Sequence, residues 1–285
     1  MDKLLAWSIL QQSGDKEGLK KLGEPDQDAL NKLFGGPDEA TLMKESIQVA
    51  TNPKVEEKDK VIALENFEML IENLDNANNI GNLGLWPELV KLLNSDVPDD
   101  LRIIVSGIIG TAVQNNPKSQ EDFDKTNGGL ESLIKIAESP KNQPLQLKSL
   151  YAISSYIRNY KPGFQEFEKL KGWNLIKLDS KDQKVDLRIL SLISSILSNG
   201  LDDNLEKQFK DIKLIHYLAS VLNLDSNTNL VDKSLNIISE LHRLKYEFSL
   251  EETYEVDRGI QVVEGLSDKL NIDDLNGAKE ATKKK

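Results

Sequence analysis

The chain has 285 residues, of which 39% are hydrophobic and 29% are charged. That composition provides enough apolar material for a sizeable core and argues against a wholly disordered chain. The formal net charge of -11 repels nucleic-acid phosphates and anionic membrane surfaces, so we expect neither as a partner. The sequence has no cysteine, which excludes disulfides, thiolate metal sites and cysteine nucleophiles.

The first residues do not have the pattern of a targeting segment. Residues 1–10 are apolar, but the stretch is short, carries an acid at its second position and lacks a small-residue cleavage site. No apolar stretch in the sequence reaches the roughly 18 residues that a bilayer-spanning helix needs. We therefore expect a soluble, cytoplasmic protein.

Residues 1–37 are predicted to form a flexible N-terminal arm. The arm contains an apolar, peptide-like cluster that consists of Leu4, Leu5, Trp7 and Ile9. A helix of that length is marginal alone, so the cluster either forms an exposed contact peptide or docks onto the rest of the protein. Gly, Asp, Pro and Lys are common over residues 11–40, and the Gly35-Gly36-Pro37 run indicates a hinge.

The remainder of the chain contains a repeated segment with a period of about 40 residues. Aligned copies end at Asn73, Asn115, Asn159 and Asn199. Each copy is followed by a connector and then by a shorter apolar helix, over residues 86–93, 130–137, 173–178 and 214–222. A fifth, weaker copy runs from Leu230 to Leu244. Such a period, with two or three helices per unit, is typical of armadillo and HEAT repeats.

The hydrophobic pattern of the repeats predicts long helices that pack on one another. Apolar residues recur at helical spacing over residues 101–113, and residues 187–197 are apolar almost all round. We predict an all-α fold, a right-handed α-solenoid of about four armadillo-like repeats, over residues 38–245. Residues 246–285 are expected to supply a capping helix and a solvated, lysine-ended tail, with the tail over residues 271–285.

Catalytic chemistry is poorly represented in the sequence. The only two histidines, His216 and His242, stand alone on predicted helices without a partner at metal-ligand spacing. No phosphate-binding glycine motif and no HExxH zinc motif occurs. We therefore expect that the protein is not an enzyme and that it binds neither a metal ion nor a cofactor.

The ends of the aligned copies share polar residues that could form a groove. The aligned columns are Met69/Thr111/Ser155/Ser195, Glu72/Gln114/Arg158/Ser198 and Asn73/Asn115/Asn159/Asn199. Their spacing at i, i+3 and i+4 predicts one helix face, and stacked repeats would join these faces into a polar groove for a folded partner. The alternative is that each asparagine only caps the carboxyl end of its helix.

Several segments of the sequence resemble the fungal Fes-type nucleotide exchange factors. The resemblance is carried by residues 1–9, 14–16, 32–38, 42–46, 66–80 and 109–116. It is specific through residue 116, continues more loosely to residue 245 and fades beyond that point. Members of this family are armadillo-type cochaperones of the cytosolic 70-kDa heat-shock chaperone, and the mammalian heat-shock-protein-binding protein is their relative.

The resemblance implies an exchange factor that grips one lobe of the chaperone's nucleotide-binding domain and displaces the other, so that ADP loses contacts. The family's contact positions fall here on Ala77, with Asn76 beside it, and on Arg188. We expect Ala77 and Arg188 to face solvent. The alternatives are an alanine in a capping loop and a surface ion pair of Arg188 with Asp182 or Asp186.

The resemblance also implies that the N-terminal arm promotes release of bound polypeptide. The expected partner is the nucleotide-binding domain of the 70-kDa chaperone, and the protein is expected to be a monomer. A passive scaffold or an inhibitor, which binds a folded partner without exchange activity, remains the alternative, because both functions need the same groove.

Overall fold

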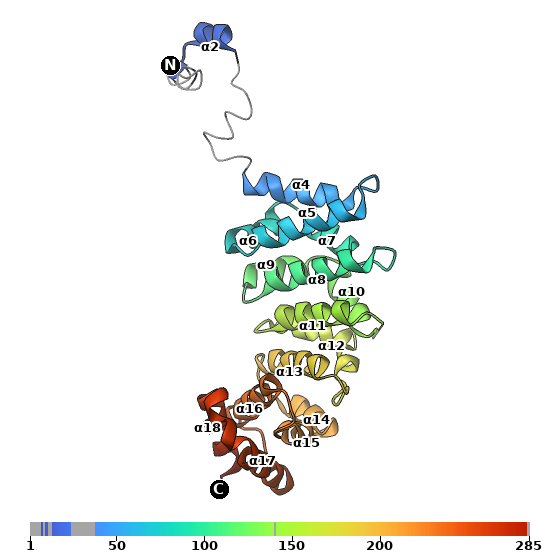
Figure 1. Ribbon diagram of the computed structural model, residues 1–285, viewed down its shortest axis with the longest axis vertical. Helices are drawn as coiled ribbons and strands as arrows, with labels where there is room; N and C mark the ends of the chain where they lie inside the picture. The colour runs from blue at the N-terminus through green and yellow to red at the C-terminus, as the bar shows by residue number, and fades with distance from the viewer. Residues whose placement is uncertain (1–6, 8, 11–12, 24–37, 140, 284–285) are drawn as a thin grey trace.

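The computed structural model describes residues 7, 9–10, 13–23, 38–139 and 141–283, and within these ranges every regular element is a helix (Figure 1). The solenoid helices are α4 (Glu39–Thr51), α5 (Glu57–Leu70), α6 (Leu74–Asn82), α7 (Trp86–Lys91), α8 (Asp99–Val113), α9 (Pro117–Asp124), α10 (Gly129–Ala137), α11 (Gln143–Ile157), α12 (Lys161–Lys169), the 3-10 turn η1 (Gly172–Leu175), α13 (Gln183–Leu197), α14 (Asp203–Asp211), α15 (Leu214–Val221) and α16 (Thr228–Arg243). The flanking elements are α2 (Lys16–Leu22), α17 (Leu250–Val263), the 3-10 turn η2 (Glu264–Lys269) and α18 (Ile272–Thr282).

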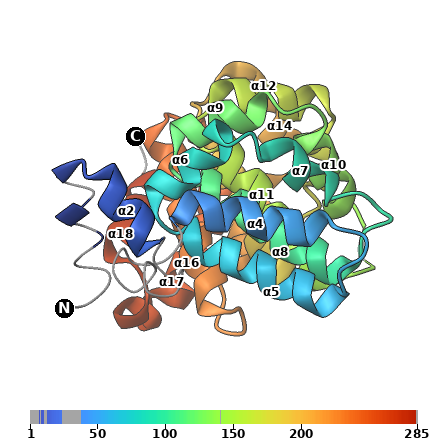
Figure 2. The same ribbon diagram turned by 90° about the horizontal axis from the view of Figure 1, so that it is seen from above.

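The long helices α5, α8, α11, α13 and α16 stack in chain order, and each packs on the next (Figure 1). We call this stack the ladder. Seen along the long axis, the shorter helices α6, α9 and α12 gather on the side opposite α5 and α8 (Figure 2). The predicted all-round burial of residues 187–197 is confirmed, because Leu190, Leu192 and Ile193 are fully buried. A helix that is apolar on every side is stable only between neighbours.

Each predicted connector contains a short helix that the sequence pattern does not reveal. Helices α9, α12 and α14 each bury one phenylalanine completely or almost completely, at Phe123, Phe167 and Phe209. The rest of each helix is mostly polar, so the apolar periodicity is too sparse to predict it. The repeats from α5 to α15 therefore contain three helices, or two helices and a 3-10 turn.

Aromatic rings connect the short helices of successive repeats to the ladder. Trp86 of α7 lies edge-on to Phe123 of α9 with 5.4 Å between ring centroids, and Phe123 lies 5.0 Å from Tyr156 of α11. The Tyr156 hydroxyl donates a hydrogen bond to Asp124. Tyr160 also contacts Asp124, and burial together with that negative charge raises the pKa of Tyr160 to about 12.

Polar clamps join the beginnings of successive long helices. The pairs are Asn142 Nδ2 to Asp99 Oδ2 (2.9 Å), Gln143 Nε2 to Asp182 Oδ2 (2.5 Å), Asn227 N to Gln183 Oε1 (2.7 Å) and Asn271 N to Asp232 Oδ1 (2.7 Å). Each pair joins residues about one repeat apart in the sequence. The clamps therefore reinforce the register in which the long helices pack.

The C-terminal segment is more ordered than the sequence predicts. Helix α18 occupies much of the region expected to be a solvated tail, and that expectation is wrong for residues 272–282. The helix packs on α16, where it buries Leu275 and Ala278, and Asp274 accepts a hydrogen bond from Asn236. Helix α18 thus extends the ladder by one further position.

The described part of the N-terminal arm contains helix α2, although composition predicted a linker there. Asp15 caps the helix by accepting a hydrogen bond from Gly18 N at 2.9 Å. Trp7 is half-buried, whereas Ile9 is 52% exposed. Leu4 and Leu5, the other members of the predicted apolar cluster, lie outside the described residues.

The side chain of Gln120 provides a test of how the repeats are joined. This buried side chain on α9 contacts the backbone carbonyls of Ser155, Tyr156 and Arg158 through Nε2, at 3.2, 2.9 and 2.9 Å. We expect Gln120→Ala to lower the free energy of unfolding by about 2 kcal/mol, because it leaves carbonyls at the end of α11 without a partner. Urea denaturation measures the loss. The exposed neighbour Glu121→Ala is the control, and an equal loss in both variants would contradict this role.

Candidate partner-binding surface

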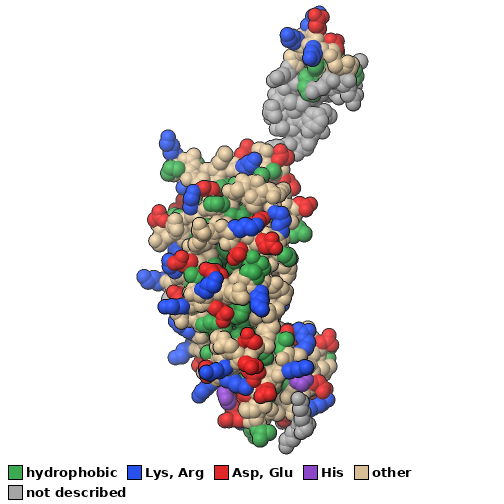
Figure 3. Space-filling view, turned by 180° about the vertical axis from the view of Figure 1, so that it is seen from behind, with side chains coloured by type: hydrophobic (Ala, Val, Ile, Leu, Met, Phe, Trp, Pro, Cys, Tyr) green, Lys and Arg blue, Asp and Glu red, His purple; other side chains and the backbone are tan. Residues whose placement is uncertain are grey.

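The ladder carries a strip of charged and aromatic side chains that reaches from α5 to α16. We call this strip the ladder face, and its members are Glu68, Lys148, Tyr151, Arg158, Arg188 and Lys233. Four of the six are cationic on a chain whose net charge is -11. Figure 3, which shows the molecule from behind the view of Figure 1, shows basic and acidic side chains interspersed over that surface.

Glycine in α8 allows residues of α5 and α11 to meet across that helix. Glu68 Oε1 and Lys148 Nζ lie 3.7 Å apart. A Cβ atom at Gly107 would lie 2.7 Å from Glu68 Oε1 and 3.0 Å from Lys148 Nζ, so a side chain at this position would displace the pair. Glycine within a helix costs roughly 1 kcal/mol relative to alanine, and the close approach explains its presence here.

Tyr151 lies at the centre of the ladder face. Its ring packs against Gly110 of α8, where a Cβ would lie only 2.5 Å from the ring. Its hydroxyl donates a hydrogen bond to Gln114 Oε1 at 3.1 Å. The Arg188 guanidinium lies over the ring, 5.4 Å from its centroid. The half-buried Arg188 thus makes a cation–π contact instead of the ion pair considered from the sequence. The contact with the ring orients the N–H donors of the guanidinium group.

Lys233 of α16 places a second cation beside Arg158 at the end of α11. Its Nζ donates to Ser194 Oγ at 2.9 Å and to Asn236 Oδ1 at 3.0 Å. Burial, together with the nearby positive charge of Arg158, lowers the pKa of Lys233 to about 8 against the opposing effect of nearby carboxylates. A carboxylate from a partner would relieve this repulsion between the two cations.

The polar stripe predicted along the long helices is wrong in its geometry. Helices α5, α8 and α11 end at Leu70, Val113 and Ile157, so the columns of Glu72 and Asn73, Gln114 and Asn115, and Arg158 and Asn159 lie in the turns that follow. Asn73 caps the start of α6 by accepting a hydrogen bond from Asp75 N. Asn115 and Asn159 have φ values of 51° and 53°, typical of residues that end a helix. Asn115 and Asn159 thus fit the alternative of a cap at the carboxyl end of a helix, whereas Asn73 caps the amino end of the helix that follows it.

Ala77 and Asn76 are packing residues in the described structure, and the expectation that Ala77 faces solvent is wrong. Ala77 is 3% exposed, and its carbonyl accepts a hydrogen bond from Ser119 Oγ at 3.2 Å. Asn76 is 4% exposed and donates from Nδ2 to Glu39 Oε2 and to Leu70 O. Both lie on the buried face of the amphipathic helix α6, together with Ile80.

The described residues offer little for catalysis. His216 pairs with Glu255 at 2.5 Å and thereby connects α15 to α17, whereas His242 is exposed at the end of α16. Within the described ranges, no three His, Asp or Glu side chains are placed to hold a metal ion. No described helix is long and apolar enough to cross a membrane.

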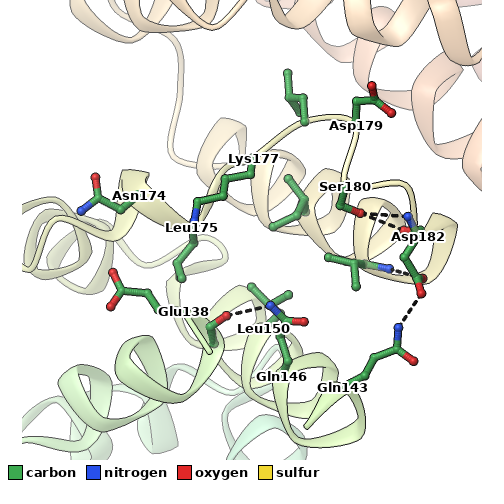
Figure 4. A pocket seen from close by; sticks show the side chains of 14 residues that line it. Glu138, Gln143, Gln146, Leu150, Asn174, Leu175, Lys177, Asp179, Ser180 and Asp182 are labelled. Carbon is green, nitrogen blue, oxygen red and sulfur yellow. Dashed lines mark hydrogen bonds between the residues drawn. The ribbon is translucent and has the colours of Figure 1, made fainter. Parts of the chain in front are cut away.

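A cavity of about 500 Å³ opens between α10, α11, η1 and α13 (Figure 4). It lies where η1 takes the place of the longer third helix of the neighbouring repeats, α10 and α15. Several of the polar side chains on its wall already have hydrogen-bond partners. Gln143 donates to Asp182, and Gln146 donates to the carbonyl of Ala137. This cavity is therefore better explained by a shortened repeat than by a ligand.

The stacked three-helix repeats define the class of protein. A designed armadillo repeat protein in complex with the peptide (KR)4 superposes with a TM-score of 0.66, at 16% identity, over 85% of this chain and 99% of its own. A computationally designed armadillo repeat protein for modular peptide recognition gives a TM-score of 0.65, at 15% identity, over 84% and 98%. The protein is an armadillo-type α-solenoid, which confirms the predicted fold class.

Sequence comparisons identify the family. The model described as nucleotide exchange factor Fes1 matches residues 1–80, and the SIL1/FES1/HPBP1 C-terminal domain model matches residues 76–245. The Hsp70 nucleotide exchange factor FES1 of Candida albicans is 69% identical over 99% of both chains. Its counterpart in Saccharomyces cerevisiae is 42% identical over 98% of this chain and 99% of its own. The chain belongs to the Fes1 family, as its sequence predicted.

Substitution of Lys233 by methionine tests the burial of the ammonium group on the ladder face. Because the folded pKa of about 8 lies below the usual 10.5, the unfolded chain binds more protons than the folded chain between these pH values. The buried charge therefore destabilises the native protein most below pH 8, and this cost disappears as the pH rises toward 10.5.

We expect Lys233→Met to gain stability relative to the native protein at pH 7, and the gain to shrink as the pH approaches 10. Urea denaturation of both proteins over this pH range measures the difference. A difference that is independent of pH would contradict the desolvated lysine.

Proposed function

We propose that this protein is a nucleotide exchange factor of a cytosolic 70-kDa heat-shock chaperone and that it grips one lobe of the nucleotide-binding domain with the ladder face. The 69% identity with an Hsp70 nucleotide exchange factor over nearly the full length carries this proposal. We further propose that it acts as a cytoplasmic monomer without catalytic chemistry of its own.

The mechanism requires only that the protein binds one state of its partner better than another. A nucleotide held between two lobes dissociates faster when a partner stabilises the open arrangement, and by linkage the nucleotide weakens that partner equally. To convert a closed majority into an open majority, the partner must bind the open state more tightly by roughly 5 kcal/mol. A long surface that spans several repeats supplies more differential contact than a small patch.

Arg158, Arg188 and Lys233 are the proposed anchors of the ladder face. Arg188 is held by the ring of Tyr151 and Lys233 by Ser194, and Arg158 adds a third positive charge near Lys233. Exposed residues of the adjoining turns complete the surface, namely Glu72, Asn73, Gln114, Asn115 and Asn159. Ala77 and Asn76 are buried packing residues in the first turn of α6. Ala77→Arg would therefore disturb packing as well as binding, so it cannot separate the two.

We expect the protein to accelerate release of labelled ADP from the chaperone, and Arg188→Glu to weaken binding at least about ten-fold, because charge reversal opposes an acidic partner group. Stopped-flow fluorescence and titration calorimetry measure the two effects. Lys135→Glu on α10 is the matched control, since the one ion pair that Lys135 makes among the described residues is with Glu131 on the same helix.

The passive alternative predicts a different outcome. A scaffold or an inhibitor would bind the chaperone tightly and leave ADP release unchanged. Equal effects of Arg188→Glu and Lys135→Glu on binding would instead show that the partner binds elsewhere than the ladder face.

The N-terminal arm has a separate proposed role. Its apolar cluster is the kind of sequence that a chaperone's peptide groove accepts, and tethering gives it a high effective concentration once the solenoid is bound. We propose that it competes for this groove and prevents a client from rebinding. Deletion of residues 1–36 should leave ADP release nearly intact but slow the discharge of a tightly held unfolded client. Discharge at the full-length rate would contradict this role.

A further inference from the structure

Helices α4 and α5 form an open apolar furrow at the N-terminal end of the solenoid. The furrow has a volume of about 600 Å³. Leu42 and Val49 of α4 line one wall, and Ile62, Met69 and Leu70 of α5 line the other. Ile62 is 54% exposed and Met69 is 71% exposed. Since the terminal repeat of a solenoid needs a polar outer face for solubility, such exposed apolar side chains require a cover.

The spacing of these residues suits a helix. On α4 the wall residues Leu42, Glu45, Ser46 and Val49 follow the i, i+3, i+4, i+7 pattern, and Asp59, Ile62, Ala63 and Asn66 follow it on α5. Two parallel stripes of this kind are the usual receptor for the apolar side of a third helix.

The furrow is acidic at its edges. Its lining includes Glu39, Glu45 and Asp59 but no lysine, arginine or histidine. Glu39 is also held in place, because it accepts a hydrogen bond from Asn76. A cationic, amphipathic helix therefore complements both the apolar floor and the charged edges.

Helix α2 of the same chain has these properties. Its exposed residues include Lys16, Lys20 and Lys21, while Leu19 and Leu22 lie one turn apart on the helix. Leu10 packs against the helix, since a Cβ at Gly18 would lie 2.7 Å from Leu10 Cδ2. A helix as short as α2 is marginal in water alone, so it gains most from burial of its leucines.

The connection between the two elements permits the contact. Residues 24–37 join α2 to α4, and a chain of that length spans at most about 50 Å when fully extended. Because α4 itself forms one wall of the furrow, the tether gives α2 a local concentration on the order of millimolar there. The Fes1 family model, which ends at residue 80, also contains both α2 and the furrow.

We propose that α2 docks in the furrow between α4 and α5, with Leu19 and Leu22 on the apolar floor and its lysines against Glu45 and Asp59. The docked helix covers the open end of the solenoid and holds the N-terminal arm close to α4. This intramolecular contact does not depend on exchange activity.

Introduced cysteines can test the contact, because the chain has none of its own. Glu17→Cys on α2 and Gln48→Cys on α4 replace exposed residues that do not line the furrow. A short bismaleimide should join them within one chain. Charge reversal by Lys16→Glu, Lys20→Glu and Lys21→Glu should slow the reaction about ten-fold, since it replaces several weak attractions with repulsions at once.

Reversal of the acidic charges on the furrow as well distinguishes docking of α2 from simple proximity. The tether and both cysteines stay the same in every variant, so only the complementary charges change. Adding Glu45→Lys and Asp59→Lys to the lysine-reversed chain should restore the fast reaction, and circular dichroism should show unchanged melting of the solenoid. A rate that charge reversal does not alter would overturn the proposal. Cross-links formed only between two chains would also overturn it, because they would make a second copy the occupant.

Discussion

The mutual burial of the long helices is the interaction on which the rest of the structure depends. A helix such as α13 is buried on both sides, and residues like Leu190 and Ile193 have no exposed surface. Since full burial of one such side chain contributes about 1.5 to 3 kcal/mol, a long helix gains its stability from the helices before and after it. This burial determines the order in which the long helices stack. The short helices, the aromatic contacts and the polar clamps reinforce that stack.

The periodicity of the sequence was sufficient to predict this stack, because long helices repeat their apolar residues many times. It was insufficient for the short helices. Helix α14 buries Phe209 and Leu205 among polar neighbours, and two apolar residues do not make a period. The same reason applies to α18, which depends on Leu275 and Ala278 in a segment that reads as a tail by composition. Tertiary contacts, not local propensity, form these elements.

The candidate site was predictable only in part. The family resemblance identified Arg188, but its contact with Tyr151 joins residues of different repeats and leaves no linear pattern. Gly107 and Gly110, inside an otherwise strongly helical segment, were the available signal that side chains from neighbouring helices approach α8 closely. For Ala77 the resemblance supplied a position but not its burial, because a position carried over from a family does not reveal whether its side chain is exposed.

The ladder also has a consequence for synthesis of the protein. Each long helix packs on helices about 40 residues away along the chain, so its contacts are short in sequence. A chain of this kind can complete one repeat as soon as the next long helix leaves the ribosome, without waiting for a distant segment. Folding can therefore advance from the N-terminal end at the pace of translation. A protein built in this way exposes about one unfinished repeat at a time during its synthesis.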